Sequence, residues 1–358
     1  MKTTTTTEPD IFLNSSTVCC ISDIHVGVHQ NSNQWHNITL EWANWLASEL
    51  AQKNVTDIVI SGDFFHYRDE IAVNTIQLAT EVLTAWRNFN IVMLVGNHDA
   101  YYKDRSDVNS LSILSGWDNI TVIDKPVSAT LFGKTVMFCP WGVSLNDISK
   151  SDIMFGHFEI SSFKQNGYKV CTTGFKASDL LEKSSLIISG HFHLRDERQY
   201  KDGRVLYLGN PFQMDFGDLE SKKGYYLLDF NTLQYEFTEN TISPRHKKIH
   251  LSELVKVGKL DKKAKKEFNN NFVKFIIDKN ISPDDVDTVL KKFTTLNSIS
   301  INVDYAANFD KYKMDEGATY DFSGIDVVTA IDEFINLMDI DNKKEVIEYT
   351  IDLYRKCK

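Results

Sequence analysis

Three features are scarce in this sequence of 358 residues: cysteine, long apolar runs and an excess of basic side chains. The five cysteines show no zinc-site spacing, and the neighbours Cys19 and Cys20 fall in a predicted strand, where they face opposite ways. This usage fits a reducing compartment. No apolar run approaches the length of a membrane span, and Lys2 followed by threonines does not resemble a signal peptide. We therefore expect a cytoplasmic protein without a membrane segment.

The charge balance is acidic, with 39 basic and 49 acidic residues and a net charge of −10. The net charge of the chain therefore gives no indication of a nucleic-acid-binding protein. The sequence contains no Gly-x-x-x-x-Gly-Lys-Ser/Thr loop, so any dependence on ATP has to come from a partner. With 42% apolar and 25% charged residues, the composition is that of a globular protein long enough for two domains and a small appendage.

Short apolar runs that end in polar side chains are the most informative feature. An apolar strand at Leu94–Val95 leads directly into Gly96, Asn97, His98 and Asp99. The same pattern places potential metal ligands after four other predicted strands: Asp23 and His25, Asp63, His157, and His191 with His193. Because the carboxyl ends of parallel strands meet at one edge of a sheet, we expect these side chains to share one pocket.

The order of elements predicts an α/β fold. Strands over 17–22, 58–61 and 91–95 alternate with amphipathic helices over 38–50 and 71–86, in which Ile76, Leu83 and Trp86 have near-helical spacing. Shorter strands follow over 120–123, 127–132, 134–139, 151–155 and 186–189, with hairpins over 197–208 and 224–237. We expect a sandwich of two sheets with helices outside.

Domain boundaries follow from changes in composition. We expect a mobile tail over 1–14, the two-sheet domain over 15–243 and a small α+β domain over 244–322. The last of these should contain strands over 272–277 and 299–303 and a helix that opens at Ser282 with Pro283 in its first turn. Residues 323–358 read as two apolar-striped helices joined at 339–341, which predicts a helical hairpin.

The types of donor indicate a pair of metal ions. Seven side chains offer oxygen or nitrogen and none offers sulfur, which favours manganese, iron or zinc over a structural cysteine–zinc site: Asp23, His25, Asp63, Asn97, His157, His191 and His193. Seven donors are too many for one ion, but two ions that share one bridging carboxylate accommodate them. Such a pair outweighs two aspartates and attracts phosphate even to an acidic chain.

A plainer interpretation exists for each residue taken singly, since a lone His or Asp after a strand is usually a turn or capping residue. The recurrence of the pattern at five strand ends favours the metal interpretation. The remaining histidines have no such setting and are assigned to surface or packing roles: His29, His36, His66, His246 and His250.

These motifs resemble the calcineurin-like metallophosphoesterases in residue type and order: Asp23-x-His25, Gly62-Asp63, Gly96-Asn-His-Asp99, Gly156-His157 and Gly190-His-Phe-His193. The final Asp99 and the lack of an Asp-Arg-Gly sequence at Asp63 argue against the protein serine/threonine phosphatase branch. The segment Gly209–Gly217 is similar to the one that leaves the phosphoesterase domain in SbcD-type DNA repair nucleases. Cys139-Pro-Trp141 and Gly156-His-Phe-Glu159 resemble the nuclease subunit of T-even-type phage recombination endonucleases.

The resemblance implies a two-sheet metallophosphoesterase sandwich flanked by helices, a small capping domain that binds DNA, and a C-terminal helical hairpin. It also implies a manganese-dependent nuclease, exonucleolytic on duplex DNA and endonucleolytic on single strands, that serves DNA repair, recombination and replication. By motif, one ion takes Asp23, His25, Asp63 and His193, and the other takes Asp63, Asn97, His157 and His191. His98 matches the histidine that assists the leaving sugar oxygen, and Asp99 is expected to orient its ring.

Partners follow from the same resemblance. Such nucleases act with an SbcC-like coiled-coil ABC-type ATPase, as a homodimer within a heterotetramer, and in the host cytoplasm if the protein is phage-encoded. We expect the terminal hairpin to dock the ATPase, although packing on the preceding domain is an alternative. Rim residues after the central motif are candidates for DNA contacts or simply an exposed polar loop: Tyr101, Tyr102, Lys103 and Arg105.

Two other functions stay open at this point. A stand-alone metallophosphodiesterase acting on a small phosphoester would have no need of residues 245–358. A non-catalytic scaffold would have lost a ligand, and every ligand position is filled.

Overall fold

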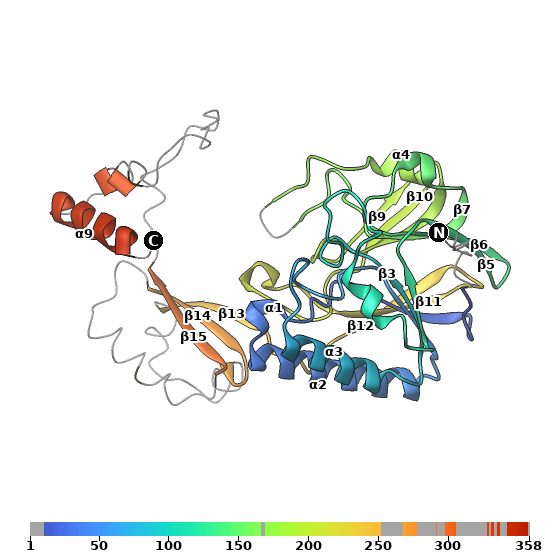
Figure 1. Cartoon of the computed structure of the whole chain (residues 1–358), viewed down its shortest axis with the longest axis horizontal. Coiled ribbons are helices and arrows are strands. Elements are labelled where there is room, and N and C mark those ends of the chain that lie inside the picture. Colours follow the sequence, from blue (N-terminus) through green and yellow to red (C-terminus); the bar gives the residue numbers. More distant parts are fainter. Residues whose placement is uncertain are drawn as a thin grey trace, which may run out of the picture. The chain divides into compact units, whose positions relative to one another are not determined.

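The structure is a computed structural model, and it describes residues 11–165, 169–251, 268–277, 298–305 and 342–356, with single helical positions at 291, 328, 331, 332, 335 and 336. The chain divides into two compact units, Met1–Tyr305 and Ala306–Lys358. The functional site lies in the first unit. Figure 1 shows the elements in chain order.

The first sheet has six strands in the order β12-β11-β1-β2-β3-β4. Its four parallel strands are β1 (Thr17–Ile21), β2 (Asp57–Ile60), β3 (Asn90–Leu94) and β4 (Ile120–Ile123), joined on one edge by antiparallel β11 (Gly224–Asp229) and β12 (Gln234–Glu239). The connections from β1 to β2 and from β2 to β3 contain α2 (Asn33–Gln52) and α3 (Val73–Ala85). Parallel neighbours require such crossovers, so the expected βαβαβ order places three strand ends side by side.

The second sheet also has six strands, in the order β5-β6-β7-β8-β10-β9. Its strands are β5 (Val127–Leu131), β6 (Lys134–Cys139), β7 (Ser151–Gly156), β8 (Ser184–Ser189), β9 (Asp196–Tyr200) and β10 (Gly203–Tyr207). The central strands β6, β7, β8 and β10 run parallel, and α4 (Ala177–Leu181) lies between β7 and β8 in the chain. Short helices η1 (Ser110–Leu114), η2 (Leu145–Asp147) and η3 (Phe216–Asp218) occupy loops.

Three apolar cores define the layers. Alternating side chains of β1 separate them: Cys19 packs with α2 and α3 on one face of the first sheet, whereas Cys20 packs between the two sheets. The outer face of the second sheet packs against Leu180 of α4. The layers are therefore helix, sheet, sheet, helix, and α2 with α3 lie opposite α4 (Figure 1). This confirms the predicted α/β sandwich flanked by helices.

A third, parallel sheet follows the sandwich in the chain, in the order β13-β14-β15. Its strands are β13 (His246–His250), β14 (Phe272–Ile277) and β15 (Ser300–Tyr305). An aromatic stack joins it to α2: Trp35 lies over Phe272 with ring centroids 5.1 Å apart, and His246 lies over Phe272 at 4.7 Å. The helix expected from Ser282 lies outside the described residues.

The second unit contains α9 (Lys343–Lys356), which matches the last helix of the predicted hairpin. Val346, Tyr349 and Leu353 are exposed along it. Most of the preceding helix lies outside the described residues, apart from the helical positions 328, 331, 332, 335 and 336. Across the parts of the chain that the structure describes, no helix has the length and apolar character of a membrane span.

Two expectations are corrected. The tail predicted over 1–14 is packed from residue 11 onward: Ile11 is buried, and Asn14 donates its backbone N–H to Asp57 Oδ1 over 2.8 Å. Ile76, which we expected on the buried stripe of its helix, is 42% exposed. The buried stripe of α3 instead contains Thr75, Leu78, Ala79, Val82 and Leu83.

Candidate metal centre

The site forms where strands of both sheets end at the same place. Asp23 and His25 follow β1, Asp63 follows β2, and Asn97 follows β3. From the second sheet, His157 follows β7, and His191 with His193 follows β8. The structure thus brings the seven predicted donors together from two sheets.

One group of donors comprises Asp23, His25 and His193, whose ligand atoms lie within 4.8 Å of one another. His25 Nε2 and His193 Nε2 are 3.0 Å apart. Asp23 and His25 are buried, and His193 is partly exposed, so one side of the group faces solvent.

A second group comprises Asp63, His157 and His191, again within 4.8 Å. Asn97 completes it, because its Oδ1 lies 2.9 Å from His157 Nε2 and 2.8 Å from His191 Nδ1. Here too the floor, Asp63 and His157, is buried, whereas Asn97 and His191 are partly exposed.

Asp63 lies between the two groups. Its Oδ2 is 3.8 Å from His25 Nε2 and 3.3 Å from His157 Nε2, one histidine in each group. Its other oxygen, Oδ1, accepts the backbone N–H of His98 over 2.8 Å. This is the position that a carboxylate shared by two cations has to occupy.

Backbone geometry at the site is unusual. Asp23, His25, Asp63 and His191 all have positive φ angles, of 55°, 51°, 55° and 88°. Non-glycine residues rarely adopt this conformation, and it costs about 1–3 kcal/mol where it is strained. The rest of the fold must therefore hold these loops in place.

Gly62 and Gly96 permit the close packing of the strand-end loops. A Cβ on Gly62, where φ is +96°, would lie 2.3 Å from His157 Nδ1. A Cβ on Gly96 would lie 2.2 Å from Asp63 Oδ1. Both glycines are thus required by ligand positions and not by their own turns alone.

Hydrogen bonds fix the tautomer of His157. Its Nδ1 is 2.7 Å from the carbonyl oxygen of Ser61, so Nδ1 carries the proton and donates it there. The lone pair of Nε2 then points at Asp63 Oδ2 and Asn97 Oδ1, which are acceptors too. The lone pairs of His157 Nε2, Asp63 Oδ2 and Asn97 Oδ1 therefore face one another and repel unless a proton or a cation lies between them. This donor set fits a divalent metal ion.

Electrostatics at the site agree with that fit. Burial lowers the pKa of His25 well below its usual range, and burial with the His157 charge lowers the pKa of His191 to about 3. Both rings are therefore neutral at neutral pH, as metal ligands must be. Burial raises the pKa of Asp63, but the charge and hydrogen bond of His157 outweigh burial and lower it. The same pairing overcomes burial at His157 and raises its pKa to about 9, so without a cation this ring carries a second proton, which a bound metal ion has to displace.

His98 belongs to neither of these two groups of donors, although its ring lies beside them and its ligand atom is within 4.8 Å of those of His25 and His66. Its Nδ1 is 2.6 Å from the carbonyl oxygen of His66, which makes Nδ1 a donor. Its ring meets the His25 ring edge to face, with centroids 4.7 Å apart. The ring is partly exposed and adjoins the pocket, as a proton donor to a bound substrate requires.

His66 is a site residue that the sequence analysis missed. Its Nδ1 lies 3.2 Å from His25 Nδ1, and its ring stacks on His98 with centroids 5.3 Å apart. When His25 presents Nε2 to a cation, its Nδ1–H can donate to His66, so His66 orients the ligand. Its position three residues after Asp63 in the same strand-end loop was the available signal.

The expected role of Asp99 is corrected. Its carboxylate is fully buried and accepts backbone N–H groups from Phe64, Phe65 and Gly96 over 3.2, 2.9 and 3.0 Å. The His98 ring is held instead by the carbonyl of His66. Asp99 therefore ties the loop after β2 to the loop after β3, because three aligned backbone donors satisfy a buried carboxylate better than one imidazole.

Comparison with known proteins identifies the family. The calcineurin-like phosphoesterase profile matches residues 16–195, half of the chain and all of the site. The chain belongs to the calcineurin-like phosphoesterase family. It is accordingly a metal-dependent phosphoesterase, a hydrolase.

Individual relatives of this phosphoesterase were also found. Exonuclease subunit 1 of Enterobacteria phage T4 is 28% identical over 351 residues, which cover 93% of this chain and 97% of the relative. Among solved structures, a novel archaeal phosphodiesterase is 15% identical and covers 63% of this chain and 99% of its own, with a TM-score of 0.35. A dimetal phosphatase from Danio rerio is 10% identical and covers 59% of this chain and 91% of its own, with a TM-score of 0.38.

The rim residues of this phosphoesterase form an exposed loop after the central motif. Tyr101 is 53% and Tyr102 is 39% exposed. The Arg105 guanidinium lies 4.0 Å from the centre of the Tyr102 ring and 3.2 Å from an Asp107 oxygen. The carbonyl of Lys103 accepts the indole N–H of Trp141, whose ring lies 5.1 Å from that of His191. The loop is therefore linked to the edge of the metal centre.

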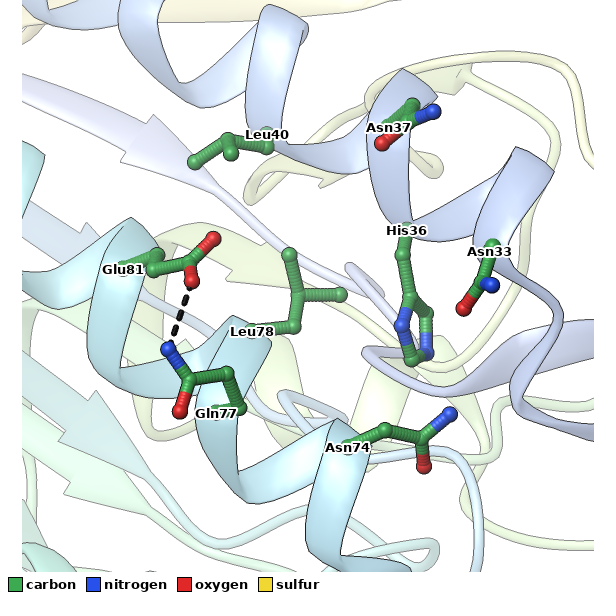
Figure 2. A pocket seen from close by; sticks show the side chains of 8 residues that line it. All are labelled: Asn33, His36, Asn37, Leu40, Asn74, Gln77, Leu78 and Glu81. Carbon is green, nitrogen blue, oxygen red and sulfur yellow. Dashed lines mark hydrogen bonds between the residues drawn. The ribbon is translucent and has the colours of Figure 1, made fainter.

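A hollow of about 220 Å³ lies elsewhere on the phosphoesterase, between α2 and α3. Figure 2 shows His36 directed into it and Gln77 bonded to Glu81 across one turn of α3. His36 Nε2 is buried without a hydrogen-bond partner. Within the described ranges, the groups of side chains with metal-ligand spacing all lie at the strand ends and not in this hollow.

Proposed function

We propose that this chain is the nuclease subunit of a DNA end-processing complex and hydrolyses phosphodiester bonds as a duplex exonuclease and a single-strand endonuclease. One observation carries the proposal: a complete two-cation donor set lies in a chain that matches an exonuclease subunit along 93% of its length. A small-phosphoester hydrolase would have no reason to preserve that similarity beyond the sandwich. The proposed role is in DNA repair, recombination and replication, in the cytoplasm where the DNA is, and in the host cytoplasm if a phage encodes the chain.

The site would hold two divalent cations, and we propose manganese because every donor is oxygen or nitrogen. When bound, the pair acidifies a water molecule and offsets the charge of the phosphodiester. We assign Asp23, His25 and His193 to one cation and Asn97, His157 and His191 to the other, with Asp63 shared.

The remaining chemistry falls to residues of the chain. His98 Nδ1–H donates to the His66 carbonyl, so the protonated ring would carry its transferable proton on Nε2 and pass it from there to the departing sugar oxygen, leaving a neutral ring. His66 keeps His25 in the tautomer that presents Nε2. The absence of a Cβ at Gly62 and Gly96 leaves the space that His157 and Asp63 occupy.

We propose that the rim loop contacts DNA. Tyr101 and Tyr102 offer exposed rings on which unpaired bases can stack, and Lys103 and Arg105 can pair with phosphates. Its link through Trp141 to the edge of the metal centre supports this assignment. The third sheet, over the proposed capping domain 244–322, would extend the contact with DNA.

The C-terminal hairpin, 323–358, is proposed to dock a coiled-coil ABC-type ATPase of the SbcC-like kind. Three apolar side chains on α9, Val346, Tyr349 and Leu353, are 37%, 68% and 50% exposed, and their spacing places them on one side of the helix. A helix-on-helix contact would bury them. We propose that two such nuclease subunits pair within a heterotetramer.

The substrate is tested by digestion in manganese. End-labelled duplex DNA, end-labelled single-stranded DNA and a small chromogenic phosphodiester are offered to the wild type and to Asp63→Asn. We expect shortening of duplex ends and internal cleavage of single strands by the wild type alone. Hydrolysis of the small phosphodiester without any DNA cleavage would overturn the proposal.

Docking is tested with surface variants of α9. Tyr349→Ser with Leu353→Ser should abolish co-purification with the ATPase and leave cleavage of single strands by the isolated subunit unchanged. Glu348→Gln, an exposed neighbour on the same helix, is the matched control. Full ATPase binding by the double variant would contradict docking through this face.

A further inference from the structure

Lys223 is a buried cation behind the metal centre. It precedes β11 and is 4% exposed. Its ammonium donates to the backbone carbonyl of His193 over 2.7 Å, to Asp218 Oδ1 over 2.6 Å and to Asn210 Oδ1. An ammonium has three protons, so all its donors are used.

The partners of Lys223 are satisfied as well. Asp218 is 3% exposed, and its Oδ2 accepts the Asn210 side-chain N–H over 2.9 Å and the Met214 backbone N–H over 2.9 Å. The carboxylate thus closes the segment from Asn210 to Asp218 into a fixed loop, and Lys223 links this loop to His193.

The His193 carbonyl is approached from several sides. Besides Lys223, the Asn210 backbone N–H reaches it over 3.3 Å. Gly209 packs so closely that a Cβ there would lie 2.7 Å from the same oxygen, at a φ of +70°. These three contacts fix the position of the His193 backbone.

This positioning matters because His193 lies at the open side of its group. Its Nε2 is 3.0 Å from His25 Nε2, and its ring is partly exposed, whereas Asp23 and His25 are buried. The buried donors are held by the core around them. His193 needs support from its backbone.

We propose that Lys223 is a positioning residue that holds the His193 carbonyl, and through it sets the cation site formed by Asp23, His25 and His193. The inference rests on the proposed two-cation site and names the group that keeps one half of it in shape. A purely structural role would be met equally well by apolar side chains, because replacing a buried ion pair with apolar residues is often neutral or stabilising. Apolar substitutions at both Lys223 and Asp218 therefore distinguish a positioning role from a purely structural one.

The experiment compares three variants of the full chain. Lys223→Met removes the contact and leaves Asp218 buried without its counter-charge. Lys223→Met with Asp218→Leu removes the contact and the unpaired charge together. Lys222→Met changes the adjacent lysine, whose side chain is 66% exposed and pairs with Glu239, and serves as the control.

Two readouts are taken with each variant: the affinity for Mn²⁺ at each site by titration, and the imidazole nitrogen shifts of His193 in the metal-free chain. We expect Lys223→Met to weaken one of the two Mn²⁺ sites by about 10–100-fold, the usual effect of losing an outer partner of a ligand. The double variant should regain part of the melting temperature lost in Lys223→Met, because the N–H groups of Asn210 and Met214 still lose their acceptor, but it should not regain the affinity. The His193 shifts should move in both variants and stay in place in Lys222→Met.

The inference is overturned if the double variant regains both melting temperature and affinity, or if the His193 shifts do not move. Failure of the proposed function gives a different result. A wild type that binds fewer than two Mn²⁺ ions contradicts the two-cation site, while the His193 shifts in the metal-free chain still decide whether Lys223 positions that residue.

Discussion

Individual residues at the strand ends carry the site, and their identities were readable from the sequence. The predicted donors lie in one pocket because each follows an apolar strand whose end is fixed by the sheet. The neighbours of those donors were harder to predict. His66 and Asp99 occur in the same loops as the donors. Several residues of these loops have positive φ angles, and the direction of a side chain in such a loop does not follow from the spacing of residues in the sequence.

Gly96 tests how tightly the ligands are packed. In Gly96→Ala the added methyl group meets Asp63 Oδ1 at 2.2 Å, so Asp63 has to move. We expect the variant to lose about 1–3 kcal/mol of unfolding free energy from overpacking and to bind Mn²⁺ weakly. Chemical denaturation and metal titration measure both.

Gly116→Ala is the matched control for that substitution, because nothing lies within 4 Å of its Cβ and its φ is not in the left-handed range. It should keep both properties. Normal metal binding by Gly96→Ala would mean that Asp63 is not held where the cations need it.

The variant His98→Ser tests whether His98 acts in proton transfer or in metal binding. His98→Ser removes a ring that contacts the His25 ring but belongs to neither group of predicted ligands. We expect both cations and DNA binding to persist while cleavage falls by about 10²–10⁴-fold, the range for loss of a general acid. Single-turnover cleavage and metal titration are compared on the same sample. A parallel fall in metal affinity would show that the residue acts on coordination.

Elements were predictable where apolar residues have a clear period. The strands of the sandwich appear within one or two residues of their expected bounds, because most of them are buried on both faces or alternate between buried and exposed residues. By contrast, β13, His246-Lys-Lys-Ile-His250, was missed because it has a single aliphatic residue. Its place is fixed by long-range contacts, namely pairing with β14 and the aromatic stack of Trp35, His246 and Phe272.

The aromatic stack gives a pH dependence to folding. Burial lowers the pKa of His246 to about 4, from 6.5 when unfolded. The unfolded chain therefore binds this proton first as the pH falls, so the stability is complete above pH 6.5 and is lost between pH 6.5 and 4. The loss approaches about 1.4 kcal/mol per pH unit for one proton.

His246→Phe should remove that component. Its Nδ1 has no hydrogen-bond partner, so the substitution loses no bond at that atom and keeps the stacking. We expect the melting temperature of the variant to fall less steeply than that of the wild type between pH 7 and 5. Equal slopes would mean that His246 is not protonated on unfolding in this range.

At the scale of the whole molecule, the fold class followed from the order of elements, whereas the relation between units did not. The two-sheet sandwich and its family were predicted and are confirmed. The third sheet belongs to the same compact unit as the sandwich and the second unit begins at Ala306, while the domain bounds predicted at 243/244 and 322/323 stay a prediction. Composition marks where a domain begins, but packing decides which segments fold together.

The proposed cation pair also reconciles the acidic charge of the whole molecule with the proposed DNA substrate. A net charge of −10 repels DNA, so attraction has to come from local positive charge. Two divalent cations in a pocket floored by Asp23 and Asp63 would supply it at the proposed point of cleavage. The proposed cleavage therefore depends on both cations being bound.

The most direct test is anomalous scattering from crystals grown in Mn²⁺, for the wild type and for Asp63→Asn, with DNA cleavage measured on the same preparations. We predict two Mn²⁺ ions in the wild type, one on each side of Asp63, and at most one ion with no cleavage in the variant. Two fully occupied ions in Asp63→Asn, or an active wild type with a single ion, would contradict the two-cation site.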